Sequence, residues 1–208
     1  SASYNDDKIA WYENTSTSGG IAAWTAATIS TNSDEPHSVD AADVDGDGDM
    51  DVLSASFNDN KLVWYENNGS QNFTSYTIAD NLGRGEDVYA IDLDSDGDVD
   101  ALTAQQTQVA WYENNGSQSF TAHSIASASG AYSVYAIDVD KDGDLDVLSA
   151  IYYDDKIAWY ENNGSQSFTA HTITTSAMSA KSVYAIDVDS DGDIDVLSAS
   201  QQDHKIAW

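Results

Sequence analysis

The sequence contains no cysteine, so no disulfide can brace the fold and no thiolate can hold a metal. Basic residues are scarce as well: 7 lysines and arginines stand against 36 aspartates and glutamates, a formal net charge of −29. A surface this acidic repels nucleic acids and anionic lipids, and we exclude both as partners. No apolar run reaches about 18 residues, which argues against a membrane span. No segment has a helical period, which leaves an all-β chain.

Twenty of the acidic residues lie in a nine-residue pattern that occurs four times: DVDGDGDMD at Asp43–Asp51, DLDSDGDVD at Asp92–Asp100, DVDKDGDLD at Asp138–Asp146 and DVDSDGDID at Asp187–Asp195. Five carboxylates in nine residues repel one another, and no basic run lies nearby, so a compact loop requires a cation. Because only oxygen ligands are available, calcium fits better than zinc or copper. The glycine at position six provides the left-handed turn that wraps the chain around an ion.

The pattern D-x-D-x-D-G also begins an EF-hand loop, but position twelve here is Ser or Thr and not the bidentate Glu. The flanking residues are typical of strands, whereas an EF-hand needs helices. We expect calcium ligands from the side chains at positions one, three, five and nine and from the carbonyl at position seven. An unliganded acidic turn is the alternative. The four candidate calcium sites comprise Asp43, Asp45, Asp47, Asp49, Asp51, Asp92, Asp94, Asp96, Asp98, Asp100, Asp138, Asp140, Asp142, Asp144, Asp146, Asp187, Asp189, Asp191, Asp193 and Asp195.

A second repeated element is a K-I-A-W-like stretch, which ends at Trp11, Trp64, Trp111, Trp159 and Trp208. A period near 48 residues indicates stacked supersecondary units such as propeller blades. One unit contains four alternating or β-branched runs, which predict strands at Ser182–Val188, Asp195–Ser200, Lys156–Asn162 and Phe168–Ile173. The Asn-Gly pair between the last two strands predicts a tight hairpin turn. One tryptophan per unit is more typical of a core between blades than of a sugar platform.

The units differ in length and in single residues. Trp24 aligns with Phe73, so the first unit has a longer link before its last strand. The third unit is two residues short at Gln105–Gln108, and Asp40 stands where later units have tyrosine, as at Tyr89. We expect one domain over residues 1–208 without a linker, with repeats at about 1–29 (partial), 37–78, 86–125, 132–173 and 181–208 (partial).

Four-stranded units with D-x-D-x-D-G-D-x-D between their first two strands resemble the FG-GAP/VCBS repeats of integrin-alpha-like β-propellers. Leu53-Ser54-Ala55 occupies the place of the GAP-like residues, and the loops bring the chain closer to the VCBS-type repeats of secreted microbial proteins. The resemblance implies an all-β fold, a β-propeller of four-stranded antiparallel blades with four to five blades represented. It also implies bound calcium and a role in adhesion, carbohydrate binding or as an accessory module.

Counting strands gives 17 for the whole chain, with the last two strands of a unit at its beginning and the first three at its end. Four blades need 16 strands and five need 20. We therefore expect an excerpt of a longer array, or self-association through strand edges at either end.

Two faces of such a propeller should differ. The links carrying the acidic loops and the hairpins repeat almost unchanged, whereas the links on the opposite face vary between units. The variable links carry five aromatic residues without an evident structural role: Tyr4, Phe57, Tyr132, Tyr152 and Tyr153. Flat rings among hydrogen-bonding groups suit a neutral glycan or a protein loop, so we expect this face to bind the ligand. The alternative is that these rings only cover the ends of the blades.

The four histidines do not indicate a catalyst. His123 and His171 occupy the strand position that Tyr76 has in another unit, which indicates packing, and His37 and His204 are isolated. Arg84 and Lys181 are the only basic residues away from the third strand of a unit and the acidic loops. Two cations are too few for the active site of an enzyme that acts on anionic sugars.

The sequence thus predicts a secreted or cell-surface, calcium-binding propeller that is a non-catalytic binding or adhesion module for a carbohydrate or protein ligand. Calcium is available at millimolar levels mainly outside cells, and the chain begins at Ser1 without a methionine or signal peptide, as a processed or trimmed product would. The alternatives are the accessory propeller of a secreted polysaccharide-degrading enzyme and an enzyme with its site in the propeller channel.

Overall fold

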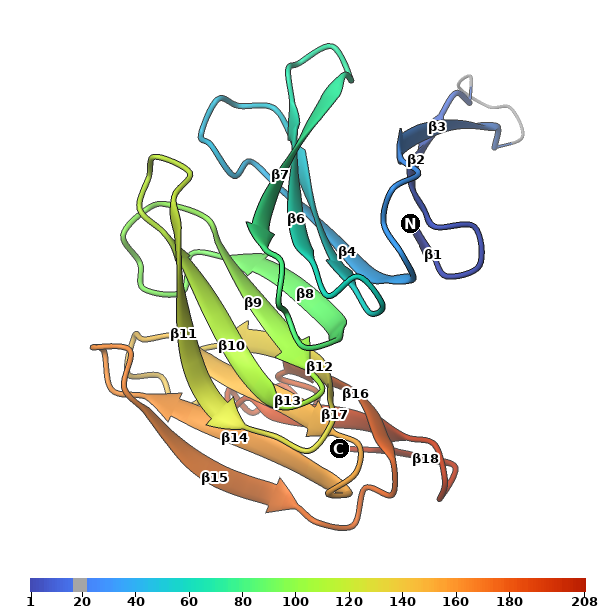
Figure 1. Cartoon of the computed structure of the whole chain (residues 1–208). Coiled ribbons are helices and arrows are strands. Elements are labelled where there is room, and N and C mark those ends of the chain that lie inside the picture. The colour runs from blue at the N-terminus through green and yellow to red at the C-terminus, as the bar shows by residue number, and fades with distance from the viewer. Residues whose placement is uncertain (17–21) are drawn as a thin grey trace.

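The computed structural model describes residues 1–16 and 22–208, which form strands and turns and no helix. Five antiparallel sheets follow one another along the chain (Figure 1). The first sheet consists of β1 (Ala2–Ser3), β2 (Lys8–Asn14) and β3 (Trp24–Ser30). Three complete sheets consist of β4 (Pro36–Ala42), β5 (Asp51–Ser56), β6 (Leu62–Asn67) and β7 (Phe73–Ala79); β8 (Gly85–Ile91), β9 (Asp100–Gln105), β10 (Gln108–Asn114) and β11 (Phe120–Ser127); and β12 (Ala131–Ile137), β13 (Asp146–Ile151), β14 (Lys156–Asn162) and β15 (Phe168–Thr174). The last sheet consists of β16 (Ala180–Ile186), β17 (Asp195–Ser200) and β18 (Lys205–Ala207).

The predicted four-stranded unit is confirmed, with three corrections. The described part of the chain has 18 strands and not 17, because Ala2 and Ser3 pair with β2 and form the short strand β1. The first strand of the last sheet begins two residues earlier than expected, at Ala180, and ends at Ile186. It ends there because the backbone N–H of Val188 turns away to the Asp195 carboxylate.

The hairpin turns are longer than an Asn-Gly pair predicts. Between β14 and β15 the turn spans residues 163–167, closed by a hydrogen bond from Asn163 N to Ser167 O of 3.3 Å. Gly164 and Gln166 both have positive φ, at 74° and 53°. The Asn163 side chain accepts N–H groups within the turn, so the asparagine organises a five-residue loop rather than a two-residue one.

Other sequence expectations hold. Trp24 pairs with Asn14 as Phe73 pairs with Asn67, so the alignment of the first unit is right, although part of its longer link falls on residues 17–21, outside the described residues. The third unit has only two residues between β9 and β10. In the described part of the chain, no helix is long and apolar enough to cross a membrane.

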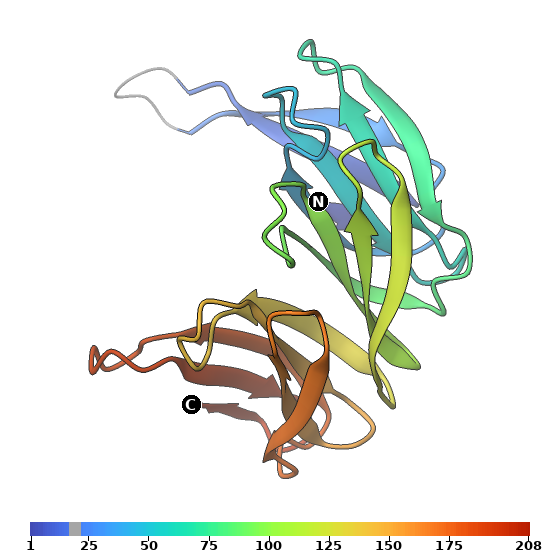
Figure 2. The same ribbon diagram turned by 90° about the vertical axis from the view of Figure 1, so that its left-hand side faces the viewer.

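The sheets lie along an arc, with the first strand of each complete unit on its inner side (Figures 1 and 2). The inner strands β4, β8, β12 and β16 contact one another in that order. The core lies between consecutive sheets, where Trp64, Trp111 and Trp159 of the third strands pack against the next sheet. Trp111, which is 2% exposed, belongs to a cluster with Val134 and Ala136 of β12. These three tryptophans are part of the core, as their period predicted, whereas Trp208 at the end of the last sheet is 69% exposed.

Stability should depend on how completely this core is enclosed. Leu102 is fully buried, whereas Leu197, in the same position of the last sheet, is only half-buried. We expect Leu102→Ala to lower the free energy of unfolding by about 2–5 kcal/mol, because a cavity remains. Leu197→Ala, the matched control, should cost less than half as much in chemical denaturation. Equal losses would contradict a core enclosed by consecutive sheets.

Candidate metal centres and the opposite face

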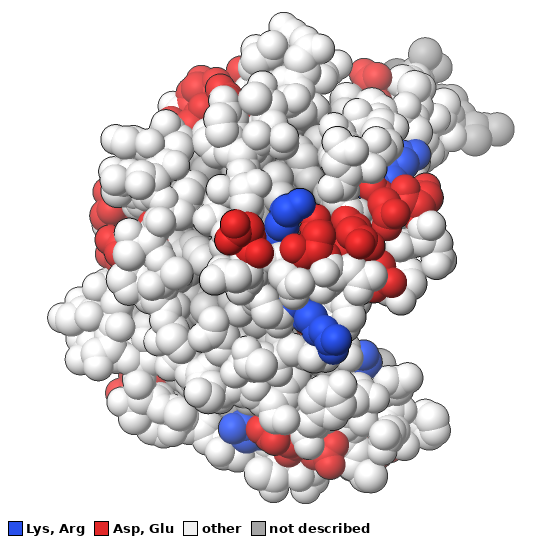
Figure 3. Space-filling model, in the orientation of Figure 1, with Lys and Arg blue, Asp and Glu red and all other residues white. Residues whose placement is uncertain are grey.

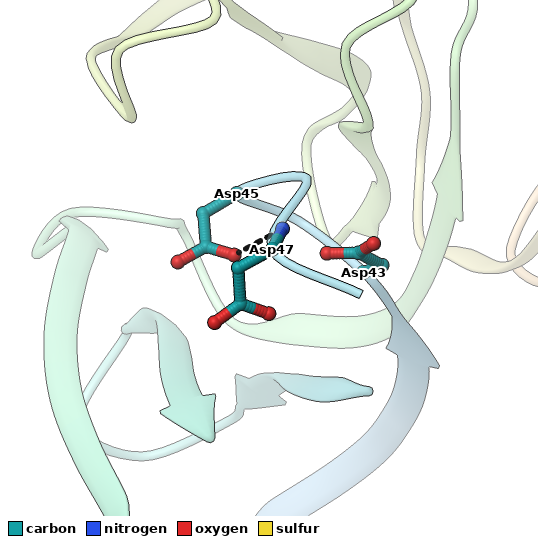
Figure 4. A group of neighbouring side chains, drawn as sticks. All are labelled: Asp43, Asp45 and Asp47. Atoms are coloured by element: carbon teal, nitrogen blue, oxygen red, sulfur yellow. Dashed lines mark hydrogen bonds between the residues drawn. The ribbon is translucent and has the colours of Figure 1, made fainter. Parts of the chain in front are cut away.

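In each acidic loop, carboxylates fold back onto the backbone of the loop. Asp43 Oδ2 accepts the N–H of Gly48 at 3.0 Å, and Asp45 Oδ1 accepts that of Asp47 at 3.2 Å. Asp47 Oδ1 in turn accepts the N–H of Asp49 at 2.9 Å. Figure 4 shows the side chains at positions one, three and five of this loop gathered around one turn. The position-one and position-five contacts recur at the same lengths in all four loops.

Two residues per loop are left-handed. Glycine at position six has φ between 96° and 101° in the four loops, as the sequence predicted. Position four is left-handed as well, and only one of its four residues is glycine: Gly46, Ser95, Lys141 and Ser190. Two left-handed turns within three residues bend the loop tightly enough to bring its first and last carboxylates together.

The structure groups three carboxylates in each loop with oxygens within 4.8 Å of one another. Positions one and three belong to all four groups. Position five completes the first two groups and position nine the last two: Asp43, Asp45 and Asp47; Asp92, Asp94 and Asp96; Asp138, Asp140 and Asp146; Asp187, Asp189 and Asp195. Four sites that could hold a metal are thus present, one per acidic loop.

The donor set fits a hard cation. All the grouped atoms are carboxylate oxygens, the ligands that a hard cation prefers. Asp43 Oδ1 and Asp187 Oδ1, both at position one, are buried without a hydrogen-bond partner. A buried carboxylate oxygen without a donor is costly unless a cation binds it. These two atoms therefore mark the place where a metal would sit.

The carboxylate at position nine links the loop to the sheet. Asp51 is fully buried; its Oδ2 accepts the loop N–H of Val44 and the indole Nε1 of Trp64, and its Oδ1 accepts the N–H of Asn67 on β6 at 2.7 Å. Asp100 makes the same backbone contacts, to Leu93 in the loop and to a residue of β10. Position nine thus anchors the first two loops to their sheets, and in the last two loops it also belongs to the metal group.

Burial makes the carboxyl groups at position nine of the three complete sheets weaker acids than a free aspartate. Burial raises the pKa of Asp51, Asp100 and Asp146, although backbone N–H groups act in the opposite direction. The largest effect is at Asp100, whose pKa rises from 3.8 to about 6. Burial also raises the pKa of Asp45 and Asp94 at position three. Without a metal, these loops therefore hold protons more tightly than the unfolded chain does.

Position seven faces away from the metal groups. In three complete sheets its carboxylate lies against the glycine of the hairpin in the same sheet: Asp49 on Gly69, Asp98 on Gly116 and Asp144 on Gly164. In the last loop, Asp193 Oδ1 accepts a hydrogen bond from Lys141 Nζ of the preceding loop at 2.6 Å, which lowers the pKa of Asp193. The side chain at position seven therefore packs against a neighbouring hairpin or loop, and its oxygens do not belong to the metal groups.

The opposite face carries the five aromatic residues singled out from the sequence, in two clusters. The tyrosine platform consists of Tyr132, Tyr152 and Tyr153, with ring centroids 4.8 and 5.0 Å apart, and Lys181 Nζ lies 3.6 Å from the centroid of Tyr132. The histidine stack consists of Tyr4, His37 and Phe57, with centroids 5.5 and 4.9 Å apart. The guanidinium of Arg84 lies 5.0 Å above Phe57.

The sequence reasoning missed the polar members of these clusters. His37 appeared isolated, and Arg84 and Lys181 appeared to be leftover cations, yet all three contact the aromatic rings. Glu86 was not singled out at all, and its Oε2 lies 2.8 Å from His37 Nδ1. The available signal was a position of the inner strand at which the otherwise similar repeats all differ. Charged side chains gather in a band beside the notch that the arc leaves open (Figure 3).

Comparison with known families gives the same repeat unit. The profile of the FG-GAP-like repeat matches four overlapping segments, residues 1–54, 43–103, 92–149 and 138–198. The chain belongs to the FG-GAP-like repeat family. Each match after the first begins at position one of an acidic loop and ends at position twelve of the next, so one FG-GAP-like repeat here runs from loop to loop. No curated protein sequence matches the chain.

Solved structures share the fold at low sequence identity. A lectin from Agrocybe aegerita, described as recognising non-reducing terminal N-acetylglucosamine, is 21% identical with a TM-score of 0.56. It is matched over 77% of this chain and 46% of its own. The biofilm matrix protein Bap1 of V. cholerae is 20% identical with a TM-score of 0.52, matched over 86% of this chain and 26% of its own. The FG-GAP-like repeats described here thus span less than half the length of either protein.

The raised pKa of Asp100 predicts a pH dependence in metal-free protein. Its contribution to the free energy of unfolding is fully present below about pH 4, the unfolded pKa, and is lost as the pH rises through about 6. Asp100→Asn removes the titrating proton. Its stability, measured by chemical denaturation in chelator, should fall less steeply between pH 4 and 7 than that of the wild type. Asp98→Asn is the control in the same loop, and an Asp100→Asn profile parallel to the wild type would contradict the assignment.

Proposed function

We propose that these FG-GAP-like repeats form a calcium-stabilised, propeller-type binding module that works outside the cell and holds a neutral glycan on the face opposite the calcium loops. Each acidic loop takes one calcium ion through the side chains at positions one, three, five and nine and the carbonyl at position seven. When bound, calcium neutralises the crowded carboxylates and fixes the loop. Millimolar calcium outside cells suits such sites.

The observation that carries the binding role is the tyrosine platform. Tyr153 is 57% exposed, and its ring sits where a side chain on Gly130 would collide, since a Cβ there would lie 2.6 Å from Tyr153 Cδ2. Gly130 has φ of 73°, and the matching positions Glu35, Arg84 and Ser179 are left-handed but carry side chains. The glycine therefore makes room for an exposed aromatic ring. Exposing a ring to water is unfavourable, which suggests that a ligand covers it.

The similar folds support a binding role without catalysis. Of the two similar structures reported above, one is a lectin and the other a biofilm matrix protein. The face that carries the acidic loops and hairpins consists of the metal groups and the packed position-seven side chains, and it is nearly the same in each repeat. The opposite face is the one that differs between repeats and exposes flat rings beside hydrogen-bonding groups, which suits a sugar ring.

The calcium assignment is tested by comparing positions five and seven of one loop. We expect Asp96→Ala to remove one of four calcium ions in a calorimetric titration, because it removes a ligand side chain. Asp98→Ala should keep all four, because position seven binds through its carbonyl, which alanine retains. A site filled at 100 times its Kd adds about 2.7 kcal/mol of stability, so the melting temperature of the Asp96 variant in calcium should also fall. Equal stoichiometry in both variants would contradict this ligand set.

The binding face is tested at the platform. Tyr153→Ala should weaken binding to an array of neutral polysaccharides about tenfold, the effect of removing roughly 1.4 kcal/mol of stacking. The melting temperature and calcium stoichiometry should not change, because the ring is exposed. Tyr12→Ala, which removes a 51%-exposed ring from β2, is the matched control and should bind normally. If binding fell instead for Asn163→Ala in a hairpin turn, the functional face would be the calcium face; retention on immobilised protein but on no glycan would favour a protein ligand.

A further inference from the structure

One position of the inner strands breaks the repeat. The second residue of β4, β8, β12 and β16 is His37, Glu86, Tyr132 and Lys181, respectively. The residue two places further along is valine in all four strands. Because the inner strands contact one another in order, the four variable side chains lie in a row across four consecutive sheets.

Side-chain contacts join the residues at each end of the row into pairs. His37 Nδ1 lies 2.8 Å from Glu86 Oε2, although the two residues are 49 positions apart in the sequence. Burial, and secondly the charge of Glu86, raise the pKa of Tyr132 to about 12, and Lys181 Nζ lies over the Tyr132 ring. The row therefore joins the histidine stack to the tyrosine platform, with Glu86 between the two clusters.

Two polar atoms in the middle of this row lack partners. The Glu86 side chain is 3% exposed, and its Oε1 is buried without a hydrogen bond. His37 Nε2 is buried without one as well. In the neutral imidazole whose Nδ1 donates to Glu86, Nε2 carries the lone pair, so both free atoms are then acceptors. An unsatisfied buried acceptor destabilises the protein, and a hydrogen-bond donor from outside would remove that cost.

Two other histidine–glutamate pairs show that this cost is particular to the row. His123 pairs with Glu113 at 2.7 Å and His171 with Glu161 at 2.6 Å, both on outer strands. Their side chains are 36% to 41% exposed, so water satisfies their remaining atoms. Only the His37–Glu86 pair, among these three, is enclosed with free acceptors.

We propose that the His37–Glu86 pair is the specificity subsite of the glycan-binding face and accepts hydrogen bonds from two neighbouring hydroxyl groups of a neutral sugar. This inference rests on the proposed function. Phe57 stacks on His37, and Tyr132 follows Glu86 at the same position of the next inner strand, so flat rings lie on both sides of the pair. Both acceptors are shielded in the free protein, so an aromatic ring beside the pair moves when the sugar enters. We assign this movement to Tyr4, whose ring lies against His37 and which is 52% exposed.

The charges around the pair select a neutral ligand. A cationic group would meet Arg84 on the Phe57 ring and Lys181 on the Tyr132 ring, where cations already occupy the aromatic faces. An anionic sugar would meet Glu86 and a chain of net charge −29. Hydroxyl groups supply donors without a charge, and the carbon–hydrogen face of a sugar ring can lie against the flanking rings.

The test compares Glu86→Gln with Glu113→Gln, the same change in an exposed histidine–glutamate pair. Both variants and the wild type are titrated with the neutral polysaccharide that binds best on the array and with methyl glycosides of its sugars. Glu86→Gln should bind at least tenfold more weakly, and Glu113→Gln should bind as the wild type does. Removing one contacted hydroxyl, in a series of monodeoxy methyl glycosides, should weaken the wild type but not the Glu86 variant further.

A second variant guards against misfolding, and a spectroscopic signal reports on the pair itself. His37→Asn keeps a donor to Glu86 and loses the Nε2 acceptor, so it should fold, with unchanged melting temperature and calcium stoichiometry, and bind about tenfold more weakly. The nitrogen resonances of His37 should shift when the glycoside is added, and those of His123 should not. If Tyr153→Ala weakens binding while both row variants bind normally, the subsite is wrong and the proposed function stands. If the wild type binds no neutral glycan, or prefers a uronic acid polymer, both the subsite and the proposed function are wrong.

Discussion

The buried carboxylate at position nine of the acidic loop joins the loop to the third strand in each of the three complete sheets. In the first complete sheet, Asp51 binds the backbone of its own loop, the indole of Trp64 and the backbone of β6 with two oxygens. It therefore fixes the end of the loop to the strand whose tryptophan builds the core between sheets. Because this carboxylate is fully buried, its negative charge is costly, and the nearby metal group is the natural place for that charge to be balanced.

The anchor at position nine also explains how one loop can combine attachment to the sheet, a candidate metal site and packing against the hairpin. With position nine fixed and two left-handed residues within the turn, positions one and three face the metal group. Position seven is then directed outward, against the hairpin of the same sheet. The alternation of aspartate along the loop thus has different consequences on its two sides: one side forms the candidate metal site and the other packs against the hairpin.

Much of this arrangement was predictable from the sequence, because it is local or periodic. The 48-residue period, the alternating strands and the D-x-D-x-D-G turn depend on contacts within one repeat, and the buried tryptophans follow from their period. The short strand β1 and the start of β16 could not be predicted, because strand ends depend on where partner backbone groups lie. The left-handed Ser95 and Lys141 were missed because neither residue type favours that conformation.

The candidate binding face divides in the same way. Tyr152 and Tyr153 stand out in the sequence because they interrupt a variable link with adjacent rings. His37 and Glu86 do not stand out, because each is a single change in a regular strand and nothing local shows that they meet. Their contact depends on the register between neighbouring sheets, which the hydrophobic pattern of one repeat leaves undetermined. Alternation tells which side of a strand is buried, but not which residue of the next sheet lies opposite.

The contact between Asp49 and Gly69 limits which residues the hairpin accepts. A larger residue in place of the glycine would displace the Asp49 side chain and would strain the backbone at a φ of 74°. The acidic loop and the hairpin of one sheet therefore constrain each other across the two strands that separate them. Because all three complete sheets carry the same aspartate and the same glycine, a hairpin exchanged between these sheets would keep the contact intact.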